Sequence, residues 1–243
     1  MQNQYDPRTT SRIDPAISGG VPRAARDAGL RTYMLKVYNY MASGVLLTGI
    51  VALLFASSGM AAQVMTTPLK WLIILAPLGF VFAMSFGVNR MQTATLQTLF
   101  WGFAVAMGLS MSTLFLVYTG VSIAQTFFAV SAAFLGLSLY GYTTKKDLSG
   151  FGTFLIMGVV GLLVAMVINI FLQSTAMAFA ISAIGVLLFA GLTVYDTQKI
   201  KSMYAHIAGT DMMGKAAIMS ALTLYLDFIN MFQFMLAFMG DRR

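Results

Sequence analysis

The 243-residue sequence contains no cysteine and no glutamate, and its only histidine is His206. Without cysteine the chain has no disulfide, no thiolate nucleophile and no cysteine-based metal site, and one histidine cannot form a multi-histidine metal site. Charged residues make up only 9% of the chain, whereas about a quarter of a soluble domain is charged. There is also no phosphate-binding glycine loop and no paired-histidine motif. We therefore expect neither an enzyme nor a bound cofactor.

Apolar residues dominate what is present. They form 58% of the chain, and the mean hydropathy is +0.80. Seven apolar runs follow one another, each close to the roughly 20 residues that cross a bilayer as a helix. They lie at about 35–57, 69–89, 95–118, 122–143, 151–173, 176–197 and 216–239. The sequence thus predicts an all-α membrane protein, a bundle of seven transmembrane helices in a lipid bilayer.

The chain divides into two parts by composition. Residues 1–32 are rich in proline, glycine, arginine, serine and threonine, and such a segment buries too little apolar surface to order itself. It has no apolar stretch of the secretory type, so we do not interpret it as a signal peptide. We expect a flexible basic tail, or alternatively a docking segment for a partner, followed by a transmembrane domain at 33–243.

The basic residues indicate the orientation. If the tail is cytosolic, only Lys70, Arg242 and Arg243 of the 15 lysines and arginines fall on the opposite side. Cytosolic loops of membrane proteins collect positive charge, so a cytosolic amino terminus in the cell inner membrane is favoured. The same distribution explains the net charge of +7 without nucleic acid. A six-span model with a re-entrant last segment remains an alternative.

Two aspartates stand out inside the apolar runs. Asp227 lies within the last run, where a helix-centre aspartate costs roughly 2.5–3.5 kcal/mol and usually faces the protein interior. Asp196 lies near the cytosolic end of the sixth run. Because the two runs are joined by a short connection, we expect antiparallel neighbouring helices that bring the carboxylates together. Arg90, at the inner end of the second run, is a basic residue at a similar depth.

Simpler interpretations exist for these residues. Asp196 could pair with Lys199 three residues on, and Arg90 could anchor a helix end at the membrane surface. Thr223 and Asn230 lie one turn on either side of Asp227 and are expected to share its face as supporting polar groups.

Four segments carry a resemblance to a known family. Leu224-Tyr-Leu-Asp-Phe-Ile-Asn-Met-Phe232 resembles the last-helix signature of the Bax inhibitor-1 (transmembrane Bax inhibitor motif) family, and Tyr195-Asp-Thr-Gln-Lys-Ile200 resembles its sixth-helix motif. Lys145-Lys-Asp-Leu148 and Ala76-Pro-Leu-Gly79 are similar to its basic loop and second helix. The segments occur in the family's order from about residue 35 to 238, and the tail and lack of cysteine suit a bacterial member.

The resemblance implies a seven-helix bundle in which the last helix is central and the other six surround it. It also implies a pH-sensitive calcium leak channel, in which Asp196 and Asp227 form the pH-sensing, ion-binding pair and Arg90 latches it. Other members of the family restrain a membrane-embedded protease or act in stress survival. A regulator that binds such a protease is therefore the alternative function.

The chemistry of the pair can be argued without the resemblance. Ionising both of two adjacent carboxyl groups in a low-dielectric site is energetically unfavourable. Near neutral pH the two groups would therefore share a proton and stay in a hydrogen-bonded contact, the closed state. Loss of that proton adds charge, separates the helices and presents oxygen ligands. Calcium takes six to eight oxygen ligands, so Asp196, Asp227 and neighbouring oxygens would bind it weakly. A proton-coupled transporter is a further, less favoured alternative.

Overall fold

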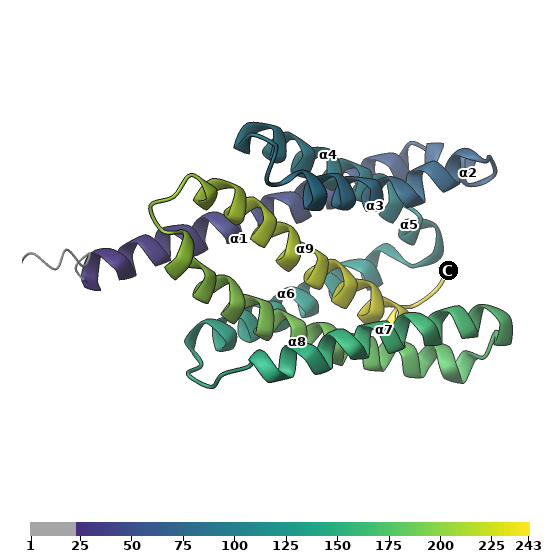
Figure 1. Ribbon diagram of the computed structural model, residues 1–243. Helices are drawn as coiled ribbons and strands as arrows, with labels where there is room; N and C mark the ends of the chain where they lie inside the picture. Colours follow the sequence, from purple (N-terminus) through teal and green to yellow (C-terminus); the bar gives the residue numbers. More distant parts are fainter. Residues whose placement is uncertain (1–22) are drawn as a thin grey trace, which may run out of the picture.

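The computed structural model describes residues 23–243, and this part of the chain is folded into helices without a β-strand. Seven of the helices are long and apolar enough to cross a membrane, which confirms the predicted seven-helix membrane protein. Two short helices, α2 and α5, lie between the long ones (Figure 1). The bounds are α1 Arg23–Ser57, α2 Met60–Met65, α3 Leu69–Gly87, α4 Thr93–Met111, α5 Leu114–Val117, α6 Gly120–Thr143, α7 Ser149–Leu172, α8 Thr175–Ile207 and α9 Met212–Met239.

The last helix, α9, lies between two groups of helices. Figure 1 shows α1, α3 and α4 on one side of it and α6, α7 and α8 on the other. α9 packs most extensively against α8 and also against α1, α6 and α4. The main neighbours of α3 and α7 are instead α4 and α8, respectively. Half of the most apolar window of α9 is buried, a larger share than in any other span, because α9 supplies much of the core that its neighbours cover.

Two helices extend beyond the apolar runs. α1 begins at Arg23, so residues 23–32 are helical. Residues 1–22 of the expected tail lie outside the described residues. α8 continues past the end of the sixth run to Ile207. It stops just before Gly209, whose φ of +77° is accessible mainly to glycine.

The two ends of the described chain lie at opposite ends of the bundle (Figure 1). The carboxy-terminal residues pack against the connection between α5 and α6. Thr119 N donates to Asp241 O at 3.1 Å, and Arg243 N donates to Val117 O at 2.9 Å. α9 itself is one continuous helix of 28 residues. The alternative of a re-entrant last segment is therefore wrong.

Hydroxyl groups link α9 to its neighbours inside the apolar core. Tyr33 on α1 hydrogen-bonds Ser220 on α9 at 3.1 Å. Tyr225 on α9 hydrogen-bonds Thr48 on α1 at 2.6 Å, and Thr48 Oγ1 in turn donates to Ala104 O on α4 at 2.8 Å. Interhelical bonds of this kind help to hold membrane helices together, so polar contacts as well as packing join α9 to α1, and α1 to α4.

Candidate functional site: two carboxyl groups between α8 and α9

Asp227 is enclosed by the bundle. Its side chain is 4% exposed, and the residues on either side of it, Leu226 and Phe228, pack in or against the core cluster. Its Oδ2 atom is buried and accepts no hydrogen bond from any N–H or hydroxyl group within residues 23–243. A buried polar atom without a partner is uncommon and costs about 1–3 kcal/mol. A donor for this oxygen would therefore have to come from the group beside it.

That group is the carboxyl of Asp196. Asp196 is half-buried on α8, and its side chain lies within hydrogen-bonding reach of Asp227. A carboxylate only accepts hydrogen bonds, whereas a protonated carboxyl also donates one. One proton held between Asp196 and Asp227 would thus supply the donor that the pair otherwise lacks. The structure brings together the two aspartates that the sequence singled out.

The positions of the two aspartates along α8 and α9 explain why their side chains lie close together. Asp196 lies 11 residues before the end of α8 at Ile207, and Asp227 lies 15 residues after the start of α9 at Met212. At 1.5 Å per residue these separations are about 16 and 22 Å. Because α8 and α9 are antiparallel and joined by a short turn, the difference of about one helical turn leaves the two residues nearly level.

Two lysines lie between the pair and the end of α8 at Ile207. Lys199 is the cation with an electrostatic effect on Asp196, but its Nζ also lies 5.9 Å from the ring centre of Tyr195. Lys201 Nζ donates to the carbonyl oxygen of Tyr142 at 2.6 Å and so ties α8 to the end of α6. Lys201 is five residues from Asp196, or about 7.5 Å along the helix. The pair therefore lies inside the bundle, in the part toward the α8–α9 turn.

The structure does not bring Arg90 to the pair. Arg90 is exposed in the turn after α3, and α3 packs mainly on α4 rather than on α9. The groups that act on Asp196 and Asp227 are Lys199 and the two aspartates themselves. The role of Arg90 as a latch therefore stays a prediction.

The side chains of Thr223 and Asn230 form hydrogen bonds within their own helix, α9. Thr223 Oγ1 donates to Met219 O at 3.2 Å, and Asn230 Nδ2 donates to Leu226 O at 2.8 Å. Neither bond reaches a carboxyl group of the pair. The oxygen atoms of both side chains lie one turn from Asp227 and keep free acceptor capacity.

A chain of hydroxyl groups beside Asp196 was not expected from the sequence. Thr197, the next residue along α8, is buried and bonds Ser138 on α6 at 3.0 Å. Ser138 also bonds the hydroxyl of Tyr38 on α1. The sequence offers no signal for this chain, because each member is a single hydroxyl residue in a different apolar run.

No group of three or more His, Asp, Glu or Cys side chains occurs within residues 23–243. A cation at this site would therefore meet two carboxyl groups and otherwise neutral oxygens. Such a ligand set is poor for a resident metal, since Ca²⁺ takes six to eight oxygens. It suits a cation in transit, which has to leave as readily as it enters.

Comparison with known proteins places this arrangement in a family. The model of the family described as "Inhibitor of apoptosis-promoting Bax1" matches residues 30–243, which include both aspartates, most of α1 and the other six long helices. The chain belongs to the Bax inhibitor-1 family. Protein RP147 of Rickettsia prowazekii (strain Madrid E) is 50% identical over 219 residues, covering 89% of this chain and 92% of that protein.

Two further bacterial relatives of the Bax inhibitor-1 family are similar over nearly their whole length. Inner membrane protein YbhL of Escherichia coli (strain K12) is 44% identical over 220 residues, or 89% of this chain and 94% of the relative. A protein of Caulobacter vibrioides (strain ATCC 19089 / CIP 103742 / CB 15) is 44% identical over 230 residues, or 89% and 91%.

Proposed function

We propose that this protein is a pH-sensitive cation leak channel that favours calcium, with the carboxyl pair of Asp196 and Asp227 as its gate. The observation that carries the proposal is the buried Oδ2 of Asp227, which lacks an ordinary donor and lies beside a second carboxyl. A structural salt bridge would have placed a basic group there. A pair of acids with no basic group between them instead responds to the proton concentration.

The closed state in this proposal has one proton between the two carboxyl groups. Two full negative charges about 3 Å apart would repel by about 5–6 kcal/mol at an effective dielectric constant near 20, so the singly protonated pair is favoured. When the pH rises and the proton leaves, the repulsion pushes α8 and α9 apart. Four carboxylate oxygens then face the gap. The leak should accordingly increase with pH.

The same oxygens account for the proposed preference for calcium. Carboxylate and carbonyl oxygens are the ligands that Ca²⁺ takes in proteins, and a divalent ion offsets two negative charges. Asn230 and backbone carbonyls would add neutral oxygens. The proposed gate uses the two aspartates without Arg90, which is exposed in the turn after α3.

The proposed location is the bacterial inner membrane, with the amino terminus in the cytosol. It is supported by the printed name of the relative YbhL and by the concentration of basic residues on the side of the α8–α9 turn. The gate would then face the cytosol, and its proton would be controlled by cytosolic pH.

Calcium flux into liposomes tests the proposal. The purified protein is reconstituted in vesicles that contain a calcium indicator, and the initial rate is measured between about pH 6 and pH 8.5. Asp227→Asn replaces the titrating carboxyl by an amide that can donate permanently to Asp196, so we expect a low flux that no longer rises with pH. Asp211→Asn, at an exposed position before α9, is the matched control and should behave as the unmodified protein. If Asp227→Asn keeps the pH-dependent flux of the unmodified protein, the gate is not this pair.

A further inference from the structure

A groove of about 400 Å³ lies between α1 and α6. The main packing partners of α1 are α4 and α9, and those of α6 are α8 and α9, so the two helices leave a gap between them. Leucines line the groove and turn away from the core: Leu35 is 52% exposed, Leu135 68% and Leu139 63%. Tyr38 and Ser138 also line it, and the hydrogen bond between them joins α1 to α6. In a bilayer, the surroundings that reach such a groove are the acyl chains of lipids.

One end of the groove is basic. Arg31 on α1 lines this end, and a second hollow of about 390 Å³ follows it, with Arg26 on α1 and Lys201 on α8 in its lining. The two hollows adjoin, because Lys201 Nζ donates to the backbone oxygen of Tyr142 at 2.6 Å and Tyr142 lines the groove. Asp27 is the acidic residue in the two linings. Basic side chains therefore outnumber acidic ones there by three to one.

The connection between α6 and α7 adds two lysines beside this basic end. It is the basic loop of the sequence, Lys145-Lys-Asp-Leu148, and it follows directly on Thr144, which lines the second hollow. Gln198 on α8 lines the same hollow and holds the loop in place. Its Nε2 donates to Lys146 O at 2.7 Å, and its Oε1 accepts from Leu148 N at 3.0 Å. The loop is thus fixed against α8 at the basic end of the groove.

The acidic residue of the loop bonds to α7. Asp147 Oδ1 accepts from Ser149 N at 2.9 Å and from Ser149 Oγ at 2.6 Å, and the start of a helix is a favourable place for a negative charge. Lys145 and Lys146 are both exposed. Their positive charges therefore remain available beside the hollow.

The basic end lies at the level where the apolar runs stop. Arg31 precedes the first run, at 35–57, by four residues, and Lys145 and Lys146 follow the fourth run, which ends at 143. The ends of apolar runs lie near the polar headgroups of a bilayer, whereas the runs themselves lie in the hydrocarbon. The basic end and the leucine-lined part therefore match, in position and in chemistry, the phosphate and the acyl chain of one phospholipid.

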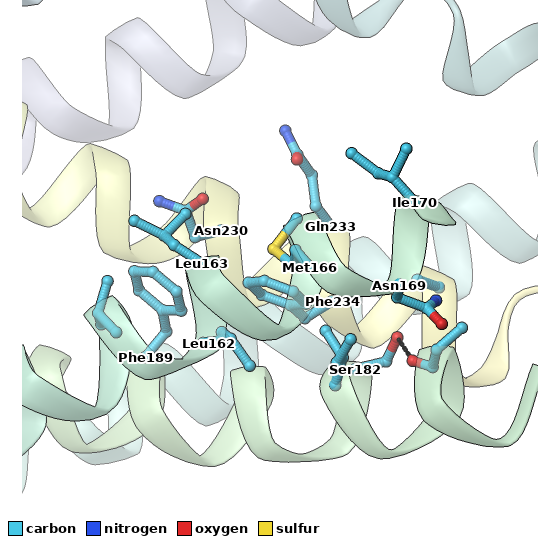
Figure 2. Close-up of a pocket in the computed structure, with 14 residues that line it drawn as sticks. Leu162, Leu163, Met166, Asn169, Ile170, Ser182, Phe189, Asn230, Gln233 and Phe234 are labelled. Carbon is cyan, nitrogen blue, oxygen red and sulfur yellow. Dashed lines mark hydrogen bonds between the residues drawn. The ribbon is translucent and has the colours of Figure 1, made fainter. Parts of the chain in front are cut away.

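A second groove of similar size offers a comparison. It has a volume of about 440 Å³ and lies between α7, α8 and α9 (Figure 2). Apolar side chains such as Leu163 line it, with three amides and one hydroxyl among them, and no charged side chain of residues 23–243 does so. Acyl chains fit either groove. Of the two, the α1–α6 groove is the one that offers positive charge to a headgroup.

We propose that the α1–α6 groove binds an anionic phospholipid, with the phosphate held by Arg26, Arg31 and Lys201 and an acyl chain between the leucines. The planar fork of arginine matches phosphate oxygens, and Lys201 keeps donors beyond the one that it gives to Tyr142. Basic pockets between transmembrane helices are known to bind anionic headgroups. A zwitterionic phospholipid gains less from this site, because its own ammonium group offsets its phosphate.

Quenching by spin-labelled lipids tests the site. Since the chain has no natural cysteine, Leu139→Cys can be labelled with bimane and reconstituted in phosphatidylcholine vesicles. Phosphatidylglycerol or phosphatidylcholine with a nitroxide on the acyl chain is then added in increasing fractions. We expect half-maximal quenching at an at least three-fold lower fraction of phosphatidylglycerol. The matched control is Leu163→Cys in the uncharged groove, 56% exposed against 63% for Leu139, and the two lipids should quench its label equally.

Charge variants of the labelled protein locate the headgroup. Arg31→Gln should lower the preference for phosphatidylglycerol at least two-fold. Lys36→Gln changes an exposed lysine on the same helix that does not line the groove, and it should keep the preference. If Arg31→Gln does not fold, the double variant Lys145→Gln with Lys146→Gln takes its place, with a reduced preference again expected.

Three results would overturn the site. Equal quenching of the Leu139→Cys label by the two lipids would show that the groove takes lipid without regard to charge. Quenching of the Leu163→Cys label alone would show that a protein segment covers the α1–α6 groove. A preference that neither charge variant lowers would mean that the headgroup is not held at this basic end. Because no flux is measured, the lipid site and the proposed leak activity succeed or fail separately.

Discussion

Gly141 on α6 marks a close approach of two helices next to the candidate site. A Cβ atom at this position would lie 2.4 Å from the carbonyl oxygen of Val194 on α8 and 3.1 Å from the Cβ of Thr197. Ordinary contacts of a Cβ atom are 3.4–4 Å, and the nearest obstacle is backbone, which cannot rotate away. In Gly141→Ala we therefore expect α6 and α8 to separate by about 1 Å at this level.

The cost follows from the groups involved. Overpacking of this kind typically destabilises by about 1–3 kcal/mol, and the Ser138–Thr197 hydrogen bond three residues away, now 3.0 Å, would stretch. Interhelical hydrogen bonds in membrane proteins are worth about 0.6 kcal/mol on average. Together these amount to about 1.6–3.6 kcal/mol. With about 2–4 °C per kcal/mol for a chain of this size, the melting temperature should fall by about 3–14 °C. Tryptophan fluorescence of Trp71 and Trp101 can follow the unfolding in detergent.

The matched control is Gly136→Ala on the same helix, because nothing lies within 4 Å of a Cβ atom there. Alanine is a better helix former than glycine, so this variant should be as stable as the unmodified protein or slightly more stable. Equal melting temperatures for the two alanine variants would refute the close packing of α6 on α8. Because Thr197 adjoins Asp196, Gly141→Ala should also shift the pH at which calcium flux rises, while Gly136→Ala should not.

Three further predictions concern residues around the site. Tyr225→Phe removes the buried hydroxyl that bonds Thr48 at 2.6 Å, and we expect a loss of about 0.6 kcal/mol, seen as a melting temperature about 1–2 °C lower. Arg90→Ala should leave the pH dependence of calcium flux unchanged, because the Arg90 side chain is exposed in the turn after α3. If the calcium flux of this variant no longer varied with pH, Arg90 would act as the latch of the pair. Deletion of residues 1–22 should leave the leak intact in liposomes, whereas a regulator that uses this segment would lose its partner in a co-purification assay.

The apolar runs predicted the seven long helices because hydrocarbon imposes a simple rule on the sequence: a span needs about 20 apolar residues. The rule does not define where a helix ends outside the membrane. The polar residues after Thr197 end the sixth run, yet α8 continues to Ile207, since no helix breaker occurs before Gly209. Residues 23–32 are likewise too polar to belong to the first apolar run, but they are part of α1.

The meeting of Asp196 and Asp227 could be predicted for a similar reason. Two runs joined by a short connection form antiparallel neighbours, and counting residues from the turn gives the depth of each aspartate. The count says nothing about position around the bundle. Arg90 lies three residues before Thr93, and a Cβ atom at Gly214, near the start of α9, would lie 3.0 Å from Thr93 Cγ2. Arg90 is therefore nearer to the α8–α9 turn than the pair is, and its role as a latch stays a prediction. The hydroxyl chain from Thr197 to Tyr38 was missed because it joins three helices that are distant in sequence.

The polar contacts also define which parts of the bundle would have to move for the aspartates to separate. Asp227 is on α9, which Ser220 and Tyr225 bind to α1. Asp196 is on α8, which Thr197 and Lys201 bind to α6. The two aspartates therefore belong to different hydrogen-bonded groups of helices, so repulsion between them would act across the boundary between the groups.

Tyr38 bridges that boundary. It is on α1, with the group that holds Asp227, and it bonds Ser138 on α6, which in turn bonds Thr197 beside Asp196. Separation of α8 from α9 would then either break the Tyr38–Ser138 bond or move α1 together with α6. A net hydrogen bond is worth about 1 kcal/mol, and the repulsion of two adjacent carboxylates is several times larger. In the proposed gate, the bridge would therefore hold the closed pair while a proton remains but not after it leaves.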